Sequence, residues 1–234
     1  MRDLKHLITF EKILEEAHNE WVAEAIAEGE HALGYTCFYI PEVLLNLKGC
    51  FATRLRAPRS SSADIATYYL TNRNCPYSRS ILERAIEGGY NYLSALFGSE
   101  TCAAMDRAQE HFRLLNVNPN EKFFVTHMDA PLKNDPDSKA FYRQQLELKV
   151  LKPLADTYGI DISPKAILEA IERHNEICRV LSAIGEYRKL DPAPITGYEF
   201  HVLSLVSQVA PQKKVLPLLE ETLKEISKRK TDEK

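Results

Sequence analysis

Apolar residues recur at helical spacing near the start of the chain. Leu7, Phe10, Leu14 and Trp21 lie three, four and seven residues apart, and charged residues stand among those between them. This spacing puts the apolar residues on one face of an α-helix. We therefore predict one long helix over residues 3–28, ended by one of the glycines that follow it.

Short strand-like runs then alternate with helical patterns as far as residue 131. The predicted strands cover 33–40, 52–56, 92–97 and 123–126, and the predicted helices between them cover 42–48, 61–72, 76–88 and 102–115. Alternation of this kind is typical of a parallel sheet with crossover helices.

From residue 137 onward the patterns are helical only. They predict helices over 138–158, 164–189, about 196–208 and 212–228. Pro153 should kink the first of these helices, Gly159 should end it, and Ser163 should cap the next. The polar tail over 228–234 is expected to fray.

Together these elements predict an α/β fold with a small, parallel, Rossmann-like sheet. The corresponding division of the chain is an N-terminal helix at 1–30, an α/β domain with the candidate cysteines at 31–136, and a helical segment at 137–234. Only 9 of the 234 residues are glycine, which is fewer than a sandwich or barrel of many short strands needs for its turns.

Composition narrows the possible partners. The net charge is −3 and no strongly basic stripe is present, so a nucleic-acid partner is not expected. No apolar run approaches the ~20 residues of a membrane helix. The start of the chain also lacks the basic and apolar regions of a signal peptide. We expect a cytoplasmic protein without a membrane partner.

The five cysteines are an odd number in a chain without an export signal. This favours free thiols or metal ligands over a disulfide framework. Cys-x-x-Cys, Gly-x-Gly-x-x-Gly, P-loop and Gly-x-Ser-x-Gly motifs are all absent from the sequence. The usual devices of a zinc ribbon, a dinucleotide site, an ATPase and an α/β-hydrolase are therefore missing.

Cys75 and Cys102 each stand at the start of a predicted helix. In open parallel sheets, ligand sites gather at the carboxyl ends of strands beside helix N-termini. The helix dipole favours a thiolate there, and thiolates are good metal or cluster ligands. The structural alternative is a small apolar filler. Cys37, within the first predicted strand, belongs either to the same sheet edge or to the core.

Other candidates have structural alternatives too. Cys50, at a turn, is either a ligand or a filler. Cys178 shares a predicted helix face with Ile171 and Leu181, so we expect it in the core. His127 is better explained as a strand-end residue than as a metal ligand.

Three arginines follow the second predicted strand, namely Arg54, Arg56 and Arg59. Their planar guanidinium groups suit the phosphates of an acyl-CoA, and we predict Arg54 and Arg56 as substrate-binding residues. A solvated surface cluster is the structural alternative.

Several longer motifs occur in a characteristic order. They are Gly34-Tyr-Thr-Cys-Phe-Tyr-Ile-Pro-Glu42, Gly49-Cys-Phe-Ala-Thr-Arg-Leu55, Cys75-Pro-Tyr-Ser-Arg79, Thr101-Cys102, Tyr158-Gly-Ile-Asp-Ile-Ser163, Asn175 and Pro194-Ile-Thr-Gly-Tyr-Glu199. Over about residues 30–225 this order resembles the N-terminal half of the 2-hydroxyacyl-CoA dehydratase and benzoyl-CoA reductase family, including the D-component of 2-hydroxyglutaryl-CoA dehydratase.

The resemblance implies an oxygen-sensitive protein with a 4Fe–4S cluster, of double-cubane type in a branch with additional cysteines. An ATP-dependent activator protein supplies such a protein with a low-potential electron. In the dehydratases that electron makes a ketyl radical on the acyl-CoA thioester, which then expels a hydroxyl group. By this resemblance Cys75 and Cys102 are cluster ligands, Cys37 is a third, and Glu42 lies near the catalytic site.

Two departures from the family pattern qualify this picture. Ala103 stands where the family usually has an acid, and family members continue into a second α/β domain with another cluster cysteine. We therefore expect a piece of a longer protein, a split subunit that needs a second α/β domain or chain, or a degenerate relative. The two function hypotheses are an iron–sulfur part of an acyl-CoA dehydratase or reductase, inactive alone, and a non-catalytic scaffold that keeps the fold.

Overall fold

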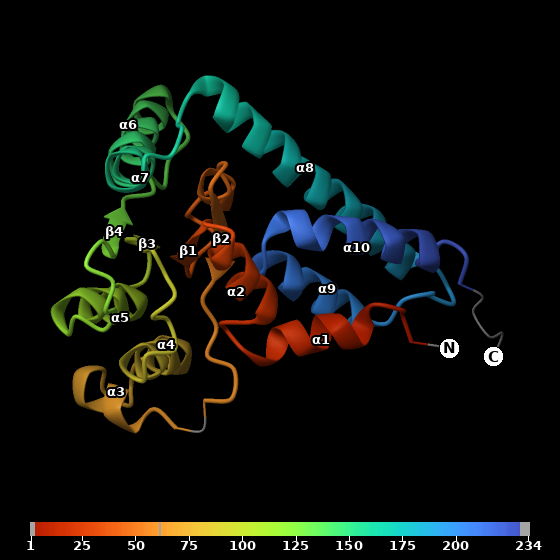
Figure 1. Cartoon of the computed structure of the whole chain (residues 1–234), viewed down its shortest axis with the longest axis horizontal. Coiled ribbons are helices and arrows are strands. Elements are labelled where there is room, and N and C mark those ends of the chain that lie inside the picture. Colours follow the sequence, from red (N-terminus) through yellow and green to blue (C-terminus); the bar gives the residue numbers. More distant parts are fainter. Residues whose placement is uncertain (1–2, 61, 230–234) are drawn as a thin grey trace.

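The computed structural model describes residues 3–60 and 62–229. Its centre is a parallel sheet with the strand order β2-β1-β3-β4, and helices lie on both sides of it (Figure 1). The strands are β1 (His31–Tyr35), β2 (Cys50–Arg54), β3 (Ala95–Ser99) and β4 (Phe124–Met128). The predicted α/β fold is confirmed. Residues 230–234 of the tail that was expected to fray lie outside the described residues.

The strands are short and mostly buried on both faces. In the middle of the sheet, Leu33 pairs with Ala52 on one side and with Ala95 on the other. Every residue of β3 is buried. Parallel strands covered on both faces need apolar residues at successive positions. This is why the sequence shows compact runs rather than a strict alternation.

The first strand is shorter than predicted. β1 ends at Tyr35, whose carbonyl accepts a hydrogen bond from the Leu55 amide at 2.8 Å. The chain then turns, with the Ile40 amide bonded to the Cys37 carbonyl. Cys37 therefore lies in the loop after the strand and not within it.

Helices connect each strand to the next. They are the 3₁₀-helix η1 (Glu42–Leu45) after β1, α3 (Asp64–Tyr69) and α4 (Pro76–Ile86) after β2, and α5 (Ala103–Leu114) after β3. After β4 follow α6 (Pro136–Leu146), the π-helix η2 (Glu147–Leu151) and α7 (Lys152–Tyr158). The irregularity expected at Pro153 thus takes the form of a π-helical segment just before it.

The N-terminal helix is divided, which corrects the prediction of one helix over 3–28. The structure has α1 (Leu7–Glu15) and α2 (Glu20–Ala27). Asn19 starts the second helix, because its side-chain oxygen accepts a hydrogen bond from the Val22 amide at 3.1 Å. An asparagine in this position satisfies one of the free amides of a new helix. This cap starts a second helix at a point where the apolar spacing alone predicts that the first continues.

The C-terminal part is helical, as expected. It contains α8 (Pro164–Glu186), the 3₁₀-helix η3 (Tyr187–Lys189), α9 (Gly197–Val209) and α10 (Gln212–Ile226). Gly159 ends α7 with φ +67° and the Ser163 side chain caps α8, so both predicted boundary residues are confirmed.

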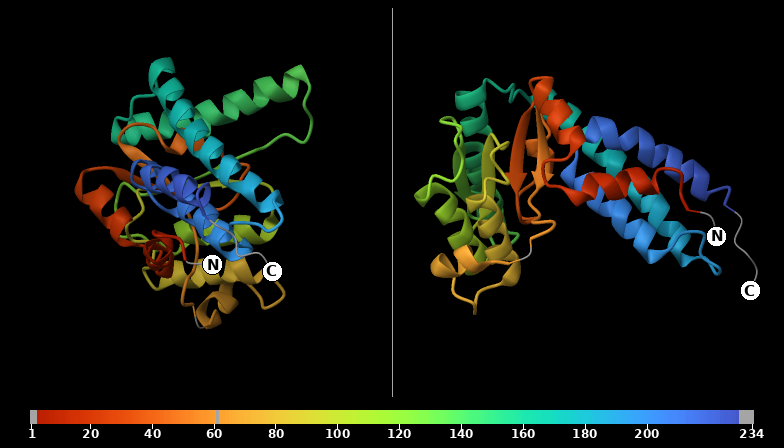
Figure 2. Two further views of the ribbon diagram at one scale, coloured as in Figure 1. Left: turned by 90° about the vertical axis from the view of Figure 1, so that its right-hand side faces the viewer. Right: turned by 60° about the horizontal axis from the view of Figure 1, so that its bottom comes forward.

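Three apolar clusters hold these layers together. On one face of the sheet, α2, α4 and α5 pack against Ala32, Phe51 and Leu96. The other face is covered by η1, α7 and the start of α8. The third cluster joins α1, the second half of α8, α9 and α10 around Phe10 and Leu203. This helical part projects from one side of the sheet (Figure 2).

Among residues 3–60 and 62–229, no helix is both long enough and apolar enough to cross a bilayer.

Candidate functional site

Cys37 and Cys102, two of the predicted site residues, lie on loops that follow the carboxyl ends of strands. In this sheet the chain leaves β1 toward β2 on one side, while β3 lies on the other side of β1. In open α/β sheets, ligands bind at the carboxyl ends of the strands beside such a reversal of strand order. The loops after β1 and β3 lie on either side of this reversal point.

Cys37 and Cys102 lie on these two loops. The Cys37 Sγ atom is 3.9 Å from the Oγ1 atom of Thr101, and Cys102 is the residue that begins α5. The Cys102 side chain is exposed and that of Cys37 is half-buried. The expected position of Cys102 at a helix start, just after a strand, is confirmed.

Cys75 begins α4 and is also exposed. Its helix is anchored to the same edge, because the Tyr77 hydroxyl donates a hydrogen bond to the Leu55 carbonyl at 2.8 Å, directly after β2. Burial raises the pKa of Tyr77, and Cys37 and Cys75 both lie near enough to add to that shift. The Tyr77 hydrogen bond therefore ties the start of α4 to the end of β2.

The donor set suits an iron–sulfur cluster in its chemistry. The thiols of Cys75 and Cys102 are exposed and stand at helix N-termini, and the half-buried Cys37 lies in the loop after β1. Within the part of the chain that the structure describes, no three His, Cys, Asp or Glu side chains are grouped closely enough to hold a metal ion as they stand.

Glu42 occupies the first turn of η1, which follows β1. Its carboxylate accepts a hydrogen bond from the Tyr35 hydroxyl, and its other oxygen is 3.3 Å from Nδ1 of His174 on α8. Burial and the nearby Glu42 charge raise the pKa of Tyr35, so the phenol remains a proton donor. Sequence patterns gave no sign that His174, 132 positions further along the chain, faces this carboxylate.

Cys178 is exposed, which corrects its expected position in the core. The buried stripe of α8 runs through Ala170, Ile177, Val180 and Ile184, about one position away from the predicted face. The exposed Sγ atom instead lies 3.4 Å from Nε2 of His174, one helical turn earlier. The four-residue spacing was a signal for this contact that the sequence analysis missed.

Cys50 is the one cysteine of the five that the structure buries. It stands at the start of β2, and its thiol donates a hydrogen bond to the Leu47 carbonyl at 3.2 Å. Burial raises the pKa of Cys50 to about 12, so this thiol stays protonated at neutral pH.

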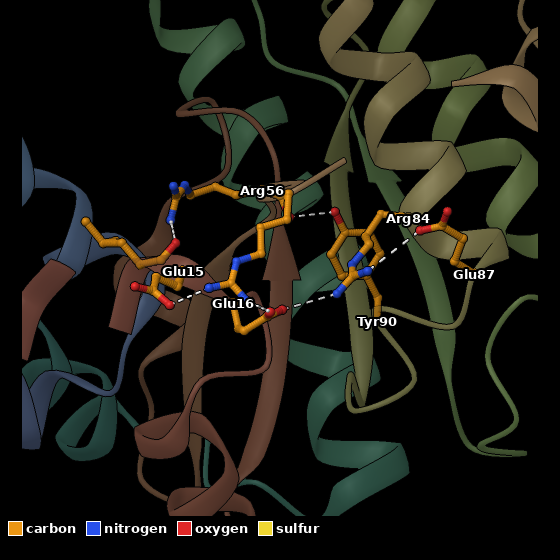
Figure 3. A network of polar contacts seen from close by, with 8 residues as sticks. Glu15, Glu16, Arg56, Arg84, Glu87 and Tyr90 are labelled. Carbon is orange, nitrogen blue, oxygen red and sulfur yellow. Dashed lines mark hydrogen bonds and ion pairs between the residues drawn. The ribbon is translucent and has the colours of Figure 1, made fainter. Parts of the chain in front are cut away.

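The arginines after β2 make contacts within the chain. Arg54 bonds to the Gln208 side chain at 2.8 Å and lies over the Phe38 ring, 4.6 Å from its centroid. Arg56 donates to the Leu14 carbonyl at 3.2 Å. Arg56 belongs to a polar network that links α1 to the α/β part (Figure 3). Glu15, Glu16, Arg59 and Arg84 contribute the ion pairs of that network.

His127 is in β4, as expected of a strand-end residue. Its Nε2 atom is buried and without a hydrogen-bond partner. Burial lowers the pKa of His127, although the neighbouring Asp106 carboxylate acts in the opposite direction.

These observations describe an α/β protein with Cys37 and Cys102 on the loops that follow its two central strands. The chain belongs to the family of the 2-hydroxyglutaryl-CoA dehydratase D-component, whose model it matches over residues 37–234. It is also similar to the (R)-phenyllactyl-CoA dehydratase beta subunit of Clostridium sporogenes, with 23% identity over 168 residues. That similarity covers 72% of this chain and 44% of the relative, so the chain spans less than half of the relative's length. The family resemblance predicted from the motifs is confirmed.

Proposed function

We propose that this chain is the cluster-binding part of a 2-hydroxyacyl-CoA dehydratase, a lyase that removes water from an acyl-CoA, with reduction of an acyl-CoA as the related possibility. The family supports the dehydratase class. The main structural support is the contact between Cys37 and Thr101, since it brings the loops after β1 and β3 together beside Cys102.

In this proposal, Cys37, Cys75 and Cys102 hold a 4Fe–4S cluster. A cluster of double-cubane type is the alternative, as in the branch of the family with additional cysteines. The cluster would supply a low-potential electron. Side chains of this chain would bind the cluster, limit its contact with water and orient the acyl-CoA. The exposure of Cys75 and Cys102 supports this role, because a cluster can reach both thiols without unfolding the core.

Glu42 would act at the substrate in the same site. Its carboxylate is held from two sides by Tyr35 and His174, and a fixed carboxylate is well suited to move a proton at a substrate hydroxyl. Arg54 and Arg56 would bind the phosphates of the CoA moiety. Arg54 is the better placed of the two, because it lies over Phe38, next to Cys37.

The proposed partners complete the site. A second α/β domain or subunit would cover the edge of the sheet on which Cys37 and Cys102 lie. An ATP-dependent activator protein would deliver the electron. We further propose a cytoplasmic location, where a reducing environment keeps thiols free.

Anaerobic purification tests the proposal. We expect brown protein with about four irons and four acid-labile sulfides per cluster, and no turnover of an acyl-CoA by the isolated chain when activator and ATP are added. Colourless, iron-free protein after anaerobic cluster reconstitution would refute the proposal that this chain binds a cluster. Robust turnover by the isolated chain would refute the need for a second α/β unit.

A non-catalytic scaffold is the second candidate. It is favoured by Arg54 and Arg56, which bond to Gln208 and to the Leu14 carbonyl and so already have structural roles. A scaffold would bind a catalytic chain without binding iron itself. The same iron measurement therefore distinguishes a scaffold from a cluster-binding chain.

A further inference from the structure

A thiol, an imidazole and a carboxylate form a chain of contacts across η1 and α8. The Sγ atom of Cys178 lies 3.4 Å from Nε2 of His174. On the other side of the same ring, Nδ1 lies 3.3 Å from Oε1 of Glu42. A nucleophile next to a base, with a third group beyond the base, is the arrangement of activated cysteine and serine sites.

The contacts favour one tautomer of the imidazole. Nδ1 is buried and makes no hydrogen bond of good geometry, and it lies 3.3 Å from the Oε1 atom of Glu42. A protonated Nδ1 is attracted to the negative charge of this carboxylate at that distance, whereas a lone pair there would be repelled. The Nε2 lone pair of His174 is therefore directed to Cys178, where it can accept the thiol proton.

The carboxylate is itself fixed. The Tyr35 hydroxyl, at the end of β1, donates a hydrogen bond to the other oxygen of Glu42. The Glu42 and His174 side chains are 20% and 26% exposed, while Cys178 is exposed. The Cys178 thiol is thus accessible to a substrate, while His174 and Glu42 are largely shielded from solvent.

The resting thiol needs this base. Burial on the inner side and the Glu42 charge raise the pKa of Cys178, so the sulfur holds its proton at neutral pH. Attack by the sulfur then requires transfer of the proton as the new bond forms, and His174 is the group within reach.

We propose that Cys178 is a nucleophile that accepts acyl groups from thioesters, with His174 as its base and Glu42 as a positioning residue. The Cys178 sulfur attacks the thioester carbonyl carbon while its proton passes to Nε2 of His174. The bond from that carbon to the leaving sulfur then breaks, and the leaving thiolate takes the proton from His174. The products are an S-acyl cysteine and a free thiol, so no oxidant or reductant is consumed.

The choice of a thioester as the substrate class rests on the proposed acyl-CoA function. The contacts among Cys178, His174 and Glu42 are independent of that proposal. The test is acylation of the full chain by S-phenyl thioacetate and, separately, by acetyl-CoA, followed by peptide mass spectrometry of each cysteine. We expect an acetyl adduct on Cys178 that forms about 100-fold more slowly in His174→Gln. The exposed His201→Gln serves as the matched control and should leave the rate unchanged.

Cys50 reports folding, because it is buried and is acylated only when the core opens. Glu42→Asp should retain more of the Cys178 rate than Glu42→Gln, since it keeps the charge that orients the imidazole. Reaction with acetyl-CoA would identify acyl-CoA as the source of the acyl group, and reaction with S-phenyl thioacetate alone would identify a smaller thioester.

Equal Cys178 rates in the unchanged chain and in folded His174→Gln would overturn the proposal, as would the absence of a Cys178 adduct. Neither result affects the iron content on which the proposed function depends.

Discussion

The Cys37 Sγ atom lies 3.9 Å from Thr101 Oγ1, so the loops after the two central strands meet at this pair. Cys102 directly follows Thr101 and begins α5. Two predicted cluster ligands therefore stand on neighbouring loops although 64 residues separate the contacting pair. The relationship depends on β1 and β3 being neighbours in the sheet.

Replacement of single cysteines should show which thiols bind iron. Cys75→Ala and Cys102→Ala should each lose most of the bound iron, because a cluster loses stability with each thiolate ligand. Cys50→Ala is the control, since Cys50 is buried at the other end of β2. Iron and sulfide are measured per chain after anaerobic purification. Undiminished iron in both exposed-cysteine variants would contradict the ligand assignment.

Cys178→Ala should change the free energy of unfolding by less than about 0.5 kcal/mol, the usual range for a surface substitution. It should also leave the iron content unchanged. The neighbouring Ile177→Ala provides the comparison, because Ile177 is 4% exposed and its truncation should cost about 2–5 kcal/mol. Urea unfolding measures both values. A large loss in Cys178→Ala would mean that this thiol does support the core.

Gly98 in β3 should not tolerate a side chain. A Cβ there would lie 1.7 Å from Oε1 of Gln109, and Gln109 is held by its hydrogen bond to Thr36 at 2.7 Å. Gly98→Ala should therefore lower stability by about 1–3 kcal/mol. Gly197→Ala is the control, because a Cβ at Gly197 meets nothing within 4 Å. Thermal unfolding of the two variants should separate them clearly, and equal melting temperatures would disprove the steric argument.

Glu199 should be essential to the helical part. Its side chain receives hydrogen bonds from Thr196 in a capping box and pairs with Arg229 at 2.9 Å. The pair is 5% and 9% exposed, so loss of one charged partner should cost about 3–5 kcal/mol. The exposed Glu172→Ala should remain within about 0.5 kcal/mol of the unchanged chain. Denaturant unfolding tests this, and a loss below 1 kcal/mol for Glu199→Ala is the contrary result.

Stability should decrease in mild acid, in part because of His31. Burial and Lys122 lower the pKa of His31, so the unfolded chain binds a proton that the folded chain does not. The contribution of His31 to the free energy of unfolding is fully present above its unfolded pKa of about 6.5. It is lost as the pH falls through the lower pKa of the folded state.

His31→Gln should therefore reduce the loss of stability between neutral and mildly acidic pH. The exposed His201→Gln should leave that loss unchanged. Unfolding free energies at several pH values give the comparison, and an identical pH dependence in all three proteins would show that His31 does not contribute.

The sequence by itself determined the features that depend on neighbours along the chain. The order of strands and helices follows from local apolar patterns, and the boundaries at Gly159 and Ser163 follow from backbone conformation and capping. The same local logic put Cys75 and Cys102 at helix starts. The family motifs were readable for the same reason, since each is a short run of adjacent residues.

The tertiary structure alone decided which distant residues meet. The position of Cys37 outside β1 and the contact of Glu42 with His174 depend on strand order and on the path of α8. The exposure of Cys178 depends on the rotation of α8 against its neighbours, because a helical period fixes relative angles around the axis but not which side faces the core. These contacts come from long-range packing, whose free energy is shared among many residues and leaves no local signature.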